Sequence, residues 1–393
     1  MTKKLTIWNT LAIMSIYLVA MSSGIVGSSV QPMIESFPEI SPATIRLTTT
    51  IPSVTAMIMM IAAGSVTGKY ISFRRICLIG AVLMLVGGVS PFLMTDSVYA
   101  ILAFRLLLGV GVGCFGVRNA LIIKCYPPEK RASLLGYGMF AAQGASIILS
   151  TLAGILAAKS WNLAYLTYSI CAVTVVLTAL FLPEPPEDKS AGDDTIKRIS
   201  FRFPWKIWMM AVLQMTVSMC SYPILIGMST YLVERQLGGA ALAGTVISVF
   251  SLGGVAVSLI FGRLYKILGK WNIPVFILIM LAGNLLIING NTMAAIYVGA
   301  AAIGGGFTAV LSAFLAYTGQ MAGPSVVTSG TTIIMALSQM GILLSSYFIS
   351  FSGMIMPSFG SEVKSSFFVG IVLYSLMILL SILCRLYPHS EKV

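Results

Sequence analysis

The sequence predicts an all-α membrane protein with twelve transmembrane helices in two pseudo-symmetric six-helix bundles. Only 9% of the 393 residues are charged, 58% are hydrophobic, and the mean hydropathy is +0.96. A water-soluble domain of this composition would lack a polar shell, so the bilayer must serve as its solvent. The chain also holds about twelve apolar segments of membrane-spanning length, and one long hydrophilic stretch divides them into two equal sets.

Each apolar segment is long enough to cover a ~30 Å hydrocarbon core, and the lack of water inside lipid forces its backbone to be helical. The first bundle is predicted to contain helices at residues 7–34, 43–68, 76–94, 98–123, 134–157 and 163–182. The second is predicted to contain helices at residues 206–233, 240–262, 273–289, 292–318, 326–352 and 365–386. The chain is thus predicted to divide into an N-terminal bundle (1–182), a central loop (183–205) and a C-terminal bundle (206–393).

The distribution of basic residues predicts the topology. Most of the 24 Lys and Arg residues fall in alternate connections, and the opposite connections hold only Arg46, Lys159, Arg235 and Lys364. By the positive-inside rule the first set is cytoplasmic, which places both termini and the central loop in the cytoplasm. The short loops and compact termini favour a bacterial cytoplasmic (inner) cell membrane. The net charge of +12 is then a topology signal, and its spread over many loops disfavours nucleic-acid partners.

The residues of common catalytic and metal sites are missing from the sequence. It contains a single histidine, His389, in the C-terminal tail, and its six cysteines form no metal-spaced pair. No nucleophile motif and no pair of carboxylates falls within an apolar segment. We therefore expect neither an enzyme nor a bound cofactor or metal.

The two halves resemble each other at a nearly constant offset. Glu35 ends the first predicted helix and Glu234 ends the seventh, 199 residues later. Gly64 and Gly262 lie near the ends of the second and eighth helices, 198 residues apart. Parallel repeats of this kind are a known plan of secondary transporters, with the substrate site between the repeats near the bilayer midplane.

The loop after the second predicted helix resembles a motif of the major facilitator superfamily, Gly-x-x-x-Asp-Arg/Lys-x-Gly followed by basic residues. The chain retains the leading glycine and the basic residues as Gly64, Lys69, Arg74 and Arg75. Gly68 replaces the acid and Ile71 replaces the second glycine. In the family this loop helps to hold one conformation, so the resemblance implies a conformational role for the retained residues without the contribution of the acid.

Two further stretches are similar to the same family. Residues 105–113 (RLLLGVGVG) resemble its Arg-x-x-x-Gly-x-Gly motif, and residues 126–136 (YPPEKRASLLG) resemble its connection into the fifth helix. Together with the helix count and the central loop, the resemblance covers the whole chain and implies a transporter that works by alternating access. The fifth helix lacks the Gly-Pro pair that drug/proton antiporters of this superfamily usually carry.

Two cations, Arg105 and Arg118, lie inside the fourth predicted helix. They are 13 residues apart, or about 220° around an α-helix, so they face different directions. Intramembrane charges are costly and mark candidate functional groups. For Arg105 the alternatives are a structural role, with hydrogen bonds to the first helix, and a role in coupling or substrate contact. For Arg118 they are snorkelling or packing near the cytoplasmic end, and anion binding in an inward-facing cavity.

None of the twelve acidic residues lies in the middle of a predicted helix, and Glu35 and Glu234 lie at extracellular helix ends. A cavity with unbalanced positive charge favours a small organic anion or a neutral amphipathic solute as substrate. The alternatives are a proton-linked multidrug efflux transporter and a non-transporting membrane sensor or scaffold with the same fold. A coupling proton or a counter-transported anion is the expected partner, and the protein is expected to be a monomer.

The resemblance implies that helices 1, 4, 7 and 10 line the cavity. The candidate substrate-binding residues on these helices are Tyr17, Arg118, Asn119, Gln214, Tyr222 and Tyr317. The candidate conformational or coupling residues are Arg105, Gly64, Lys69, Arg74, Arg75, Glu35 and Glu234. For each neutral polar side chain, an interhelical hydrogen bond is the alternative role.

Overall fold

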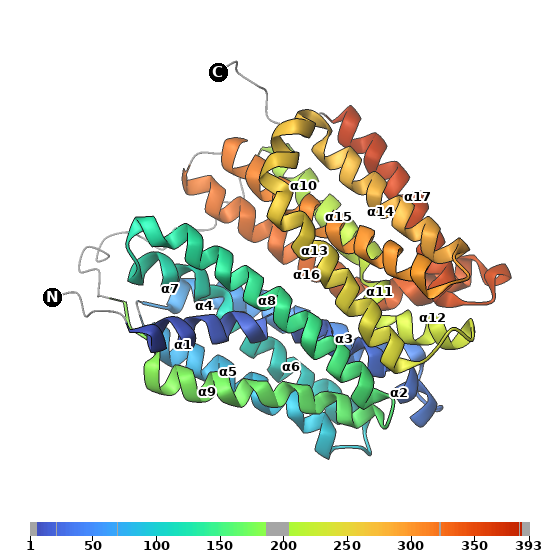
Figure 1. Ribbon diagram of the computed structural model, residues 1–393, viewed down its shortest axis with the longest axis horizontal. Coiled ribbons are helices and arrows are strands. Elements are labelled where there is room, and N and C mark those ends of the chain that lie inside the picture. Colours follow the sequence, from blue (N-terminus) through green and yellow to red (C-terminus); the bar gives the residue numbers. More distant parts are fainter. Residues whose placement is uncertain are drawn as a thin grey trace. The chain divides into compact units, whose positions relative to one another are not determined.

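The structure is a computed structural model that describes residues 6–20, 22–68, 70–185, 204–321, 324–384 and 386. These residues form helices and connections, and a single isolated β-bridge joins Thr67 to Ile71 within the described ranges. The chain divides into two compact units, Met1–Lys197 and Arg198–Val393 (Figure 1).

The first unit contains all six helical segments predicted for it, but four of them are interrupted. Its α-helices are α1 (Ile7–Ala20), α2 (Val30–Ser36), α3 (Pro42–Thr50), α4 (Pro52–Val66), α5 (Phe73–Leu93), α6 (Val98–Cys114), α7 (Arg118–Cys125), α8 (Pro128–Ala157) and α9 (Ile170–Phe181). Three 3₁₀ helices, η1 (Ser22–Ser29), η2 (Phe115–Val117) and η3 (Trp161–Ser169), continue the paths of these helices.

The second unit also contains its six predicted segments. Its α-helices are α10 (Trp205–Ser221), α11 (Pro223–Ile226), α12 (Met228–Glu234), α13 (Ala240–Leu268), α14 (Asn272–Asn289), α15 (Met293–Met321), α16 (Pro324–Ile355) and α17 (Glu362–Leu383). The seventh predicted helix is broken at Pro223 and Gly227. A proline inside a helix cannot donate to the carbonyl four residues before it, which favours such breaks.

Eleven stretches of the described residues are helical, long and apolar enough to cross a membrane. The stretch Ala240–Asn289 is 50 residues long and holds both α13 and α14, which the 3₁₀ turn η5 (Gly269–Trp271) separates. The all-α membrane fold predicted from composition is therefore confirmed, and the protein is a multi-pass membrane protein.

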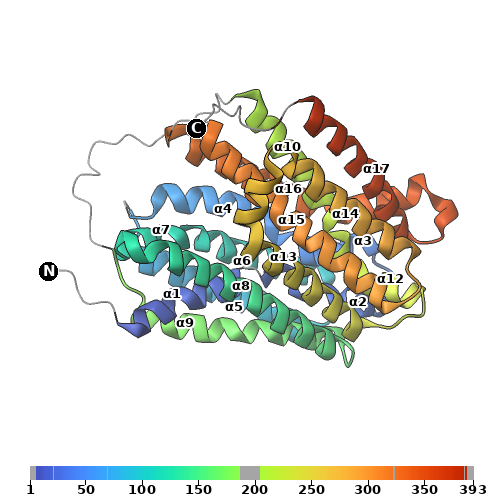
Figure 2. The same cartoon turned by 45° about the horizontal axis from the view of Figure 1, so that its top comes forward.

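A central helix packs along two neighbours in each unit. In the first unit α6 packs along α4 and α5, and α1 packs along α8 and α9 (Figure 2). In the second unit α15 packs along α13 and α14. A side chain at Gly109 would collide with the backbone carbonyl of Pro52, so this motif glycine permits the close approach of α6 to α4.

Two arginines are the charged side chains that are buried among the described residues, and both lie in the first unit. Arg105 is 0% exposed on α6, and Arg46 is 2% exposed on α3. We counted Arg46 with the outward-facing connections, although the predicted helix 43–68 contains it, and the structure places it buried on α3. A buried cation must be compensated by hydrogen bonds or rings, so its surroundings indicate its role.

Candidate functional site

Arg118 is the first residue of α7 and directly follows the 3₁₀ turn η2. Its Nη1 donates to the carbonyl oxygen of Phe115 at 3.2 Å, and its Cζ lies 5.3 Å from the centre of the Tyr17 ring. Its Nε is buried and has no hydrogen-bond partner among the described residues. The guanidinium is thus held by a backbone oxygen and an aromatic face, and it keeps unused donors.

Tyr17 and Asn119 complete this cluster, which we call the Arg118 cluster (Tyr17, Arg118 and Asn119). Tyr17 is fully buried on α1, and its hydroxyl donates to Oδ1 of Asn119, the next residue after Arg118. A Cβ at Gly138 on α8 would lie 2.8 Å from the Tyr17 ring, which is too close. The glycine therefore allows α8 to pack directly against this ring. Three of the six predicted substrate-binding residues therefore lie together.

The charge of Arg118 is not balanced by an ion pair with any described residue. Carboxylates in the described spans lie at their ends, such as Glu35 at the end of α2 and Glu362 at the start of α17. A planar guanidinium with free donors and no carboxylate partner is suited to bind a carboxylate or phosphate through two parallel hydrogen bonds.

The other three predicted substrate-binding residues do not share one site within the second unit. Gln214 is fully buried on α10, with Nε2 3.5 Å from Oγ of Ser338 on α16. Tyr317 donates to the carbonyl oxygen of Gly269 at 3.1 Å and so braces the turn between α13 and α14. Tyr222 is half-buried at the break between α10 and α11.

Arg105 makes hydrogen bonds to the second and sixth helical segments, and the predicted bonds to the first helix stay a prediction. Its Nε donates to the carbonyl oxygen of Thr48 at 2.6 Å, and its Nη1 donates to the hydroxyl of Tyr168 at 2.9 Å. The rings of Tyr165 and Tyr168 also lie 5.7 Å and 5.2 Å from Cζ. Arg105 therefore joins α3, α6 and η3 inside the first unit.

The carbonyl oxygen of Thr48 is free to accept from Arg105 because a proline follows four residues later. In a continuous helix the carbonyl of Thr48 would accept from the N–H of residue 52, but residue 52 is Pro52 and has none. An unpaired carbonyl within a membrane costs several kcal/mol, so it needs another donor. Arg105 supplies that donor, which favours the structural role for this motif arginine.

The loop after α4 shows why the chain departs from the family motif at Gly68. Gly68 has a φ of +84°, and its N–H donates to the carbonyl oxygen of Ile71 at 2.8 Å. An aspartate in this left-handed conformation would be strained. A Cβ at Gly64 would meet no atom within 4 Å, so packing does not require that glycine. Lys69 lies outside the described residues.

An acid from another segment binds the helix that follows this loop. The two carboxylate oxygens of Glu184 accept from the backbone N–H groups of Phe73 and Arg74 at 2.7 and 2.9 Å. The Arg74 side chain donates to the carbonyl of Ala179 at the end of α9, and Arg75 is exposed. Our sequence reasoning missed Glu184, although an acid placed directly after the sixth span was a usable signal.

Replacing Glu184 with glutamine should lower the stability of the purified protein by about 1 kcal/mol, because α5 loses a charged N-terminal cap. The melting temperature of the full chain in detergent measures this effect. Glu39→Gln is the matched control, because Glu39 is also exposed. Equal melting temperatures for the two variants would contradict a capping role of Glu184.

The two candidate coupling carboxylates lie at exposed helix ends. Glu35 accepts from Nε2 of Gln31 at 2.9 Å on α2. Glu234, at the end of α12, accepts from the hydroxyl of Ser361, the N-cap residue of α17. Both side chains are exposed, and their predicted role in coupling stays a prediction.

Comparison with known proteins gives one family and several similar structures. The family model described as Major Facilitator Superfamily matches residues 11–346. The structure of the nucleoside transporter NupG is similar with a TM-score of 0.78 and 12% identity, covering 98% of this chain and 100% of that chain. No curated protein sequence matches the chain.

Two further solved structures are similar to this chain. A bacterial homologue of the human lysosomal transporter Spinster, inward-facing and occupied, has a TM-score of 0.75 and 15% identity over 100% of both chains. The D-xylose-proton symporter has a TM-score of 0.72 and 13% identity over 98% of both chains. At such identities these likenesses support the fold alone.

Proposed function

Because this chain belongs to the major facilitator superfamily and is a transporter rather than an enzyme, we propose that it carries a small organic anion by alternating access. The anion binds to the guanidinium of Arg118. The observation that carries this proposal is the unbalanced charge of Arg118, whose buried Nε has no partner among the described residues.

The neighbours of Arg118 determine how an anion would bind. The Tyr17 ring limits the positions that the guanidinium can adopt, because Cζ lies over its face. Asn119 is exposed and uses Oδ1 to accept from Tyr17, which leaves the Nδ2 hydrogens as donors to a substrate oxygen. The cluster thus offers positive charge and neutral donors, and no acceptor group with a negative charge.

The distribution of carboxylates does not favour multidrug efflux of organic cations. A lipophilic cation is usually recognised by a carboxylate, and the described spans carry carboxylates at their ends alone. The same distribution leaves no carboxylate in mid-membrane as a proton carrier. Exchange against a second anion that binds to Arg118 is therefore the coupling that we propose.

The proposal is tested by melting the purified full chain with organic anions, neutral amphipathic compounds and organic cations at pH 5.5 and 7.5. A ligand that binds the folded state alone raises the melting temperature by mass action. Anions that stabilise the protein are then tested for exchange in liposomes loaded with the same anion. Stabilisation by neutral compounds or cations alone would overturn the anion proposal.

Replacing Tyr17 with phenylalanine should change anion exchange by less than about threefold, whereas Tyr17→Ala should reduce it about tenfold. Phenylalanine keeps the ring that orients Arg118, and a cation–π contact in a desolvated site is worth about 1–2 kcal/mol. Exchange in liposomes with matched protein content measures both variants. If phenylalanine were as harmful as alanine, the hydroxyl would be the important group.

A further inference from the structure

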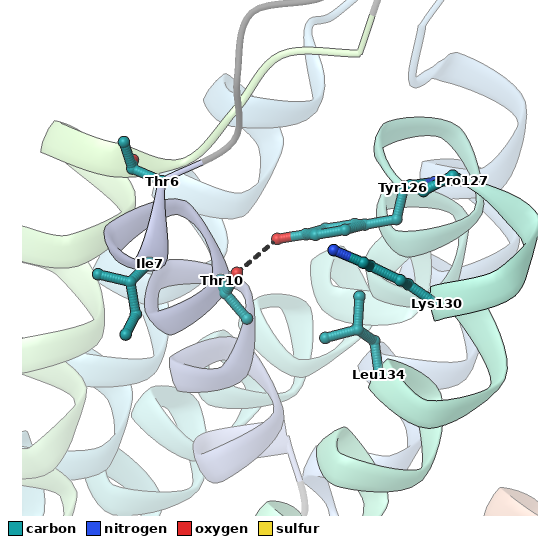
Figure 3. Close-up of a pocket in the computed structure, with 7 residues that line it drawn as sticks. All are labelled: Thr6, Ile7, Thr10, Tyr126, Pro127, Lys130 and Leu134. Carbon is teal, nitrogen blue, oxygen red and sulfur yellow. Dashed lines mark hydrogen bonds between the residues drawn. The ribbon is translucent and has the colours of Figure 1, made fainter.

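An open pocket of about 400 Å³ lies at one end of the first unit, outside the Arg118 cluster. The start of α1 forms one side, and the connection from α7 to α8 forms the other together with the first turns of α8 (Figure 3). Its lining residues all come from the first unit, so the pocket belongs to that unit alone.

The pocket lies at the boundary between membrane and water. The spans that border it begin at Ile7 and Ser133 and end at Cys125. Trp8, which follows Ile7 in the chain, is 51% exposed, and its ring centre lies 5.3 Å from that of Phe181. Exposed aromatic residues are typical of a membrane interface. The positive-inside rule predicts that this is the cytoplasmic leaflet, in which anionic lipids attract basic groups.

Lys130 supplies the positive charge of the pocket. Lys130 extends beside the Tyr126 ring, and its ammonium group points toward α1 (Figure 3). No carboxylate lines the described pocket. The neighbouring Arg131 uses Nε to donate to the carbonyl oxygen of Tyr126 at 2.8 Å, which holds this connection in place. The pocket therefore favours an anion.

Two hydroxyls lie opposite the ammonium group. Oγ1 of Thr10 and the hydroxyl of Tyr126 are 2.8 Å apart and share one hydrogen bond, as the dashed line in Figure 3 marks. Burial raises the pKa of Tyr126 above its ordinary value, so the hydroxyl stays protonated. Because the pair shares one hydrogen, the second hydroxyl hydrogen remains available to an anionic oxygen.

The remaining wall is apolar and faces the membrane. Ile7 is 72% exposed, and Leu134 lies on the first turns of α8. A free anion gains no favourable contact with apolar side chains, whereas the glycerol and upper acyl carbons of a lipid would pack against them. The pocket thus combines a headgroup site with an apolar exit toward the bilayer.

We propose that this pocket binds an anionic phospholipid of the cytoplasmic leaflet. The lipid phosphate lies between the ammonium group of Lys130 and the hydroxyls of Thr10 and Tyr126. The acyl end leaves the pocket over Ile7 and Leu134. The bound lipid then joins the start of α1 to the connection between α7 and α8.

The test measures the melting temperature of the full chain in detergent with added phosphatidylglycerol, phosphatidylcholine or inorganic phosphate. Phosphatidylglycerol should stabilise the wild type, and the other two should not. Lys130→Gln should raise the lipid concentration needed for half of the effect about fivefold, since one interfacial lysine contributes about that factor. Lys266→Gln, at an exposed lysine of α13 in another predicted cytoplasmic connection, is the matched control and should behave as the wild type.

A second variant distinguishes the contribution of the pocket's shape to lipid binding from that of the Lys130 charge. Ile7→Trp places a larger ring at the exposed apolar rim and should weaken the phosphatidylglycerol effect without changing the charge. Equal stabilisation by phosphatidylcholine, or by inorganic phosphate, would overturn the proposal of an anionic lipid. So would an unchanged lipid response in Lys130→Gln or in Ile7→Trp.

Discussion

Replacing Arg118 with alanine should reduce exchange of the anionic substrate about 10- to 100-fold and lower the stability of the unliganded protein by only about 1–2 kcal/mol. The charge-assisted hydrogen bonds from Arg118 to the anion are lost in this variant, and a net loss of about 1.4–2.7 kcal/mol corresponds to this reduction. The folded protein loses little, because the guanidinium makes one hydrogen bond, to the carbonyl of Phe115, and one contact with the Tyr17 ring. Its buried Nε has no partner among the described residues.

Two further variants separate the charge of Arg118 from its planar geometry and control for the loss of a cation elsewhere. Arg118→Lys keeps the charge but loses the planar fork, so it should retain more activity than alanine and less than the wild type. Arg263→Ala is the matched control, because Arg263 is exposed on α13. Anion exchange and anion-dependent melting are measured for all variants. Full activity of Arg118→Ala would refute the proposed role, and the snorkelling or packing alternative would then hold.

Replacing Arg105 with alanine should have the opposite effect, with a large loss of stability. The change removes the donor to the Thr48 carbonyl, which Pro52 leaves without a helical partner, and the donor to the Tyr168 hydroxyl. Two buried polar groups lose the Arg105 donor, at about 1–3 kcal/mol each, which should lower the stability by roughly 3–5 kcal/mol in total. The melting temperature of the purified protein should fall by roughly 10 °C.

Tyr168→Phe is the informative companion of this variant. It removes one acceptor but leaves Arg105 bonded to Thr48, so it should cost about 1 kcal/mol. The double variant should cost less than the sum of the single ones, because both remove the same bond. An Arg105→Ala protein that melts like the wild type but cannot transport would favour the coupling role over the structural one.

Sequence patterns predicted the helical segments well, and the interruptions less well. Residues 43–68 were predicted as one helix, but Pro52 ends α3 and starts α4. That proline was a usable signal, because a proline removes one helical hydrogen bond. The 3₁₀ helices η1 and η3 contain no proline, and both have spanning length together with their neighbours, although Ser and Gly fill six of the eight positions of η1. Their geometry depends on packing within the unit.

Among the candidate residues, too, the sequence predicted some features and missed others. The sequence marked Tyr17, Arg118 and Asn119 as candidates, because polar groups in apolar segments are few and costly, and the structure places the three together. It did not predict that Tyr317 braces the α13–α14 turn, since the acceptor on Gly269 is 48 residues away in the chain. Nor did it predict the cap that Glu184 provides, which spans 111 residues to Phe73.

The sequence by itself determined the solvent of this protein, the number of its helical segments and the two arginines that interrupt an apolar helix. Composition and periodicity are sufficient for these properties, because the bilayer rejects charge and unpaired backbone wherever they occur. The tertiary structure alone decided the surroundings of the two arginines. Arg105 meets a carbonyl freed by a proline 53 residues before it, and Arg118 meets an aromatic face but no carboxylate among the described residues. Such partners are set by the packing of helices that are distant in the chain, which local sequence does not encode.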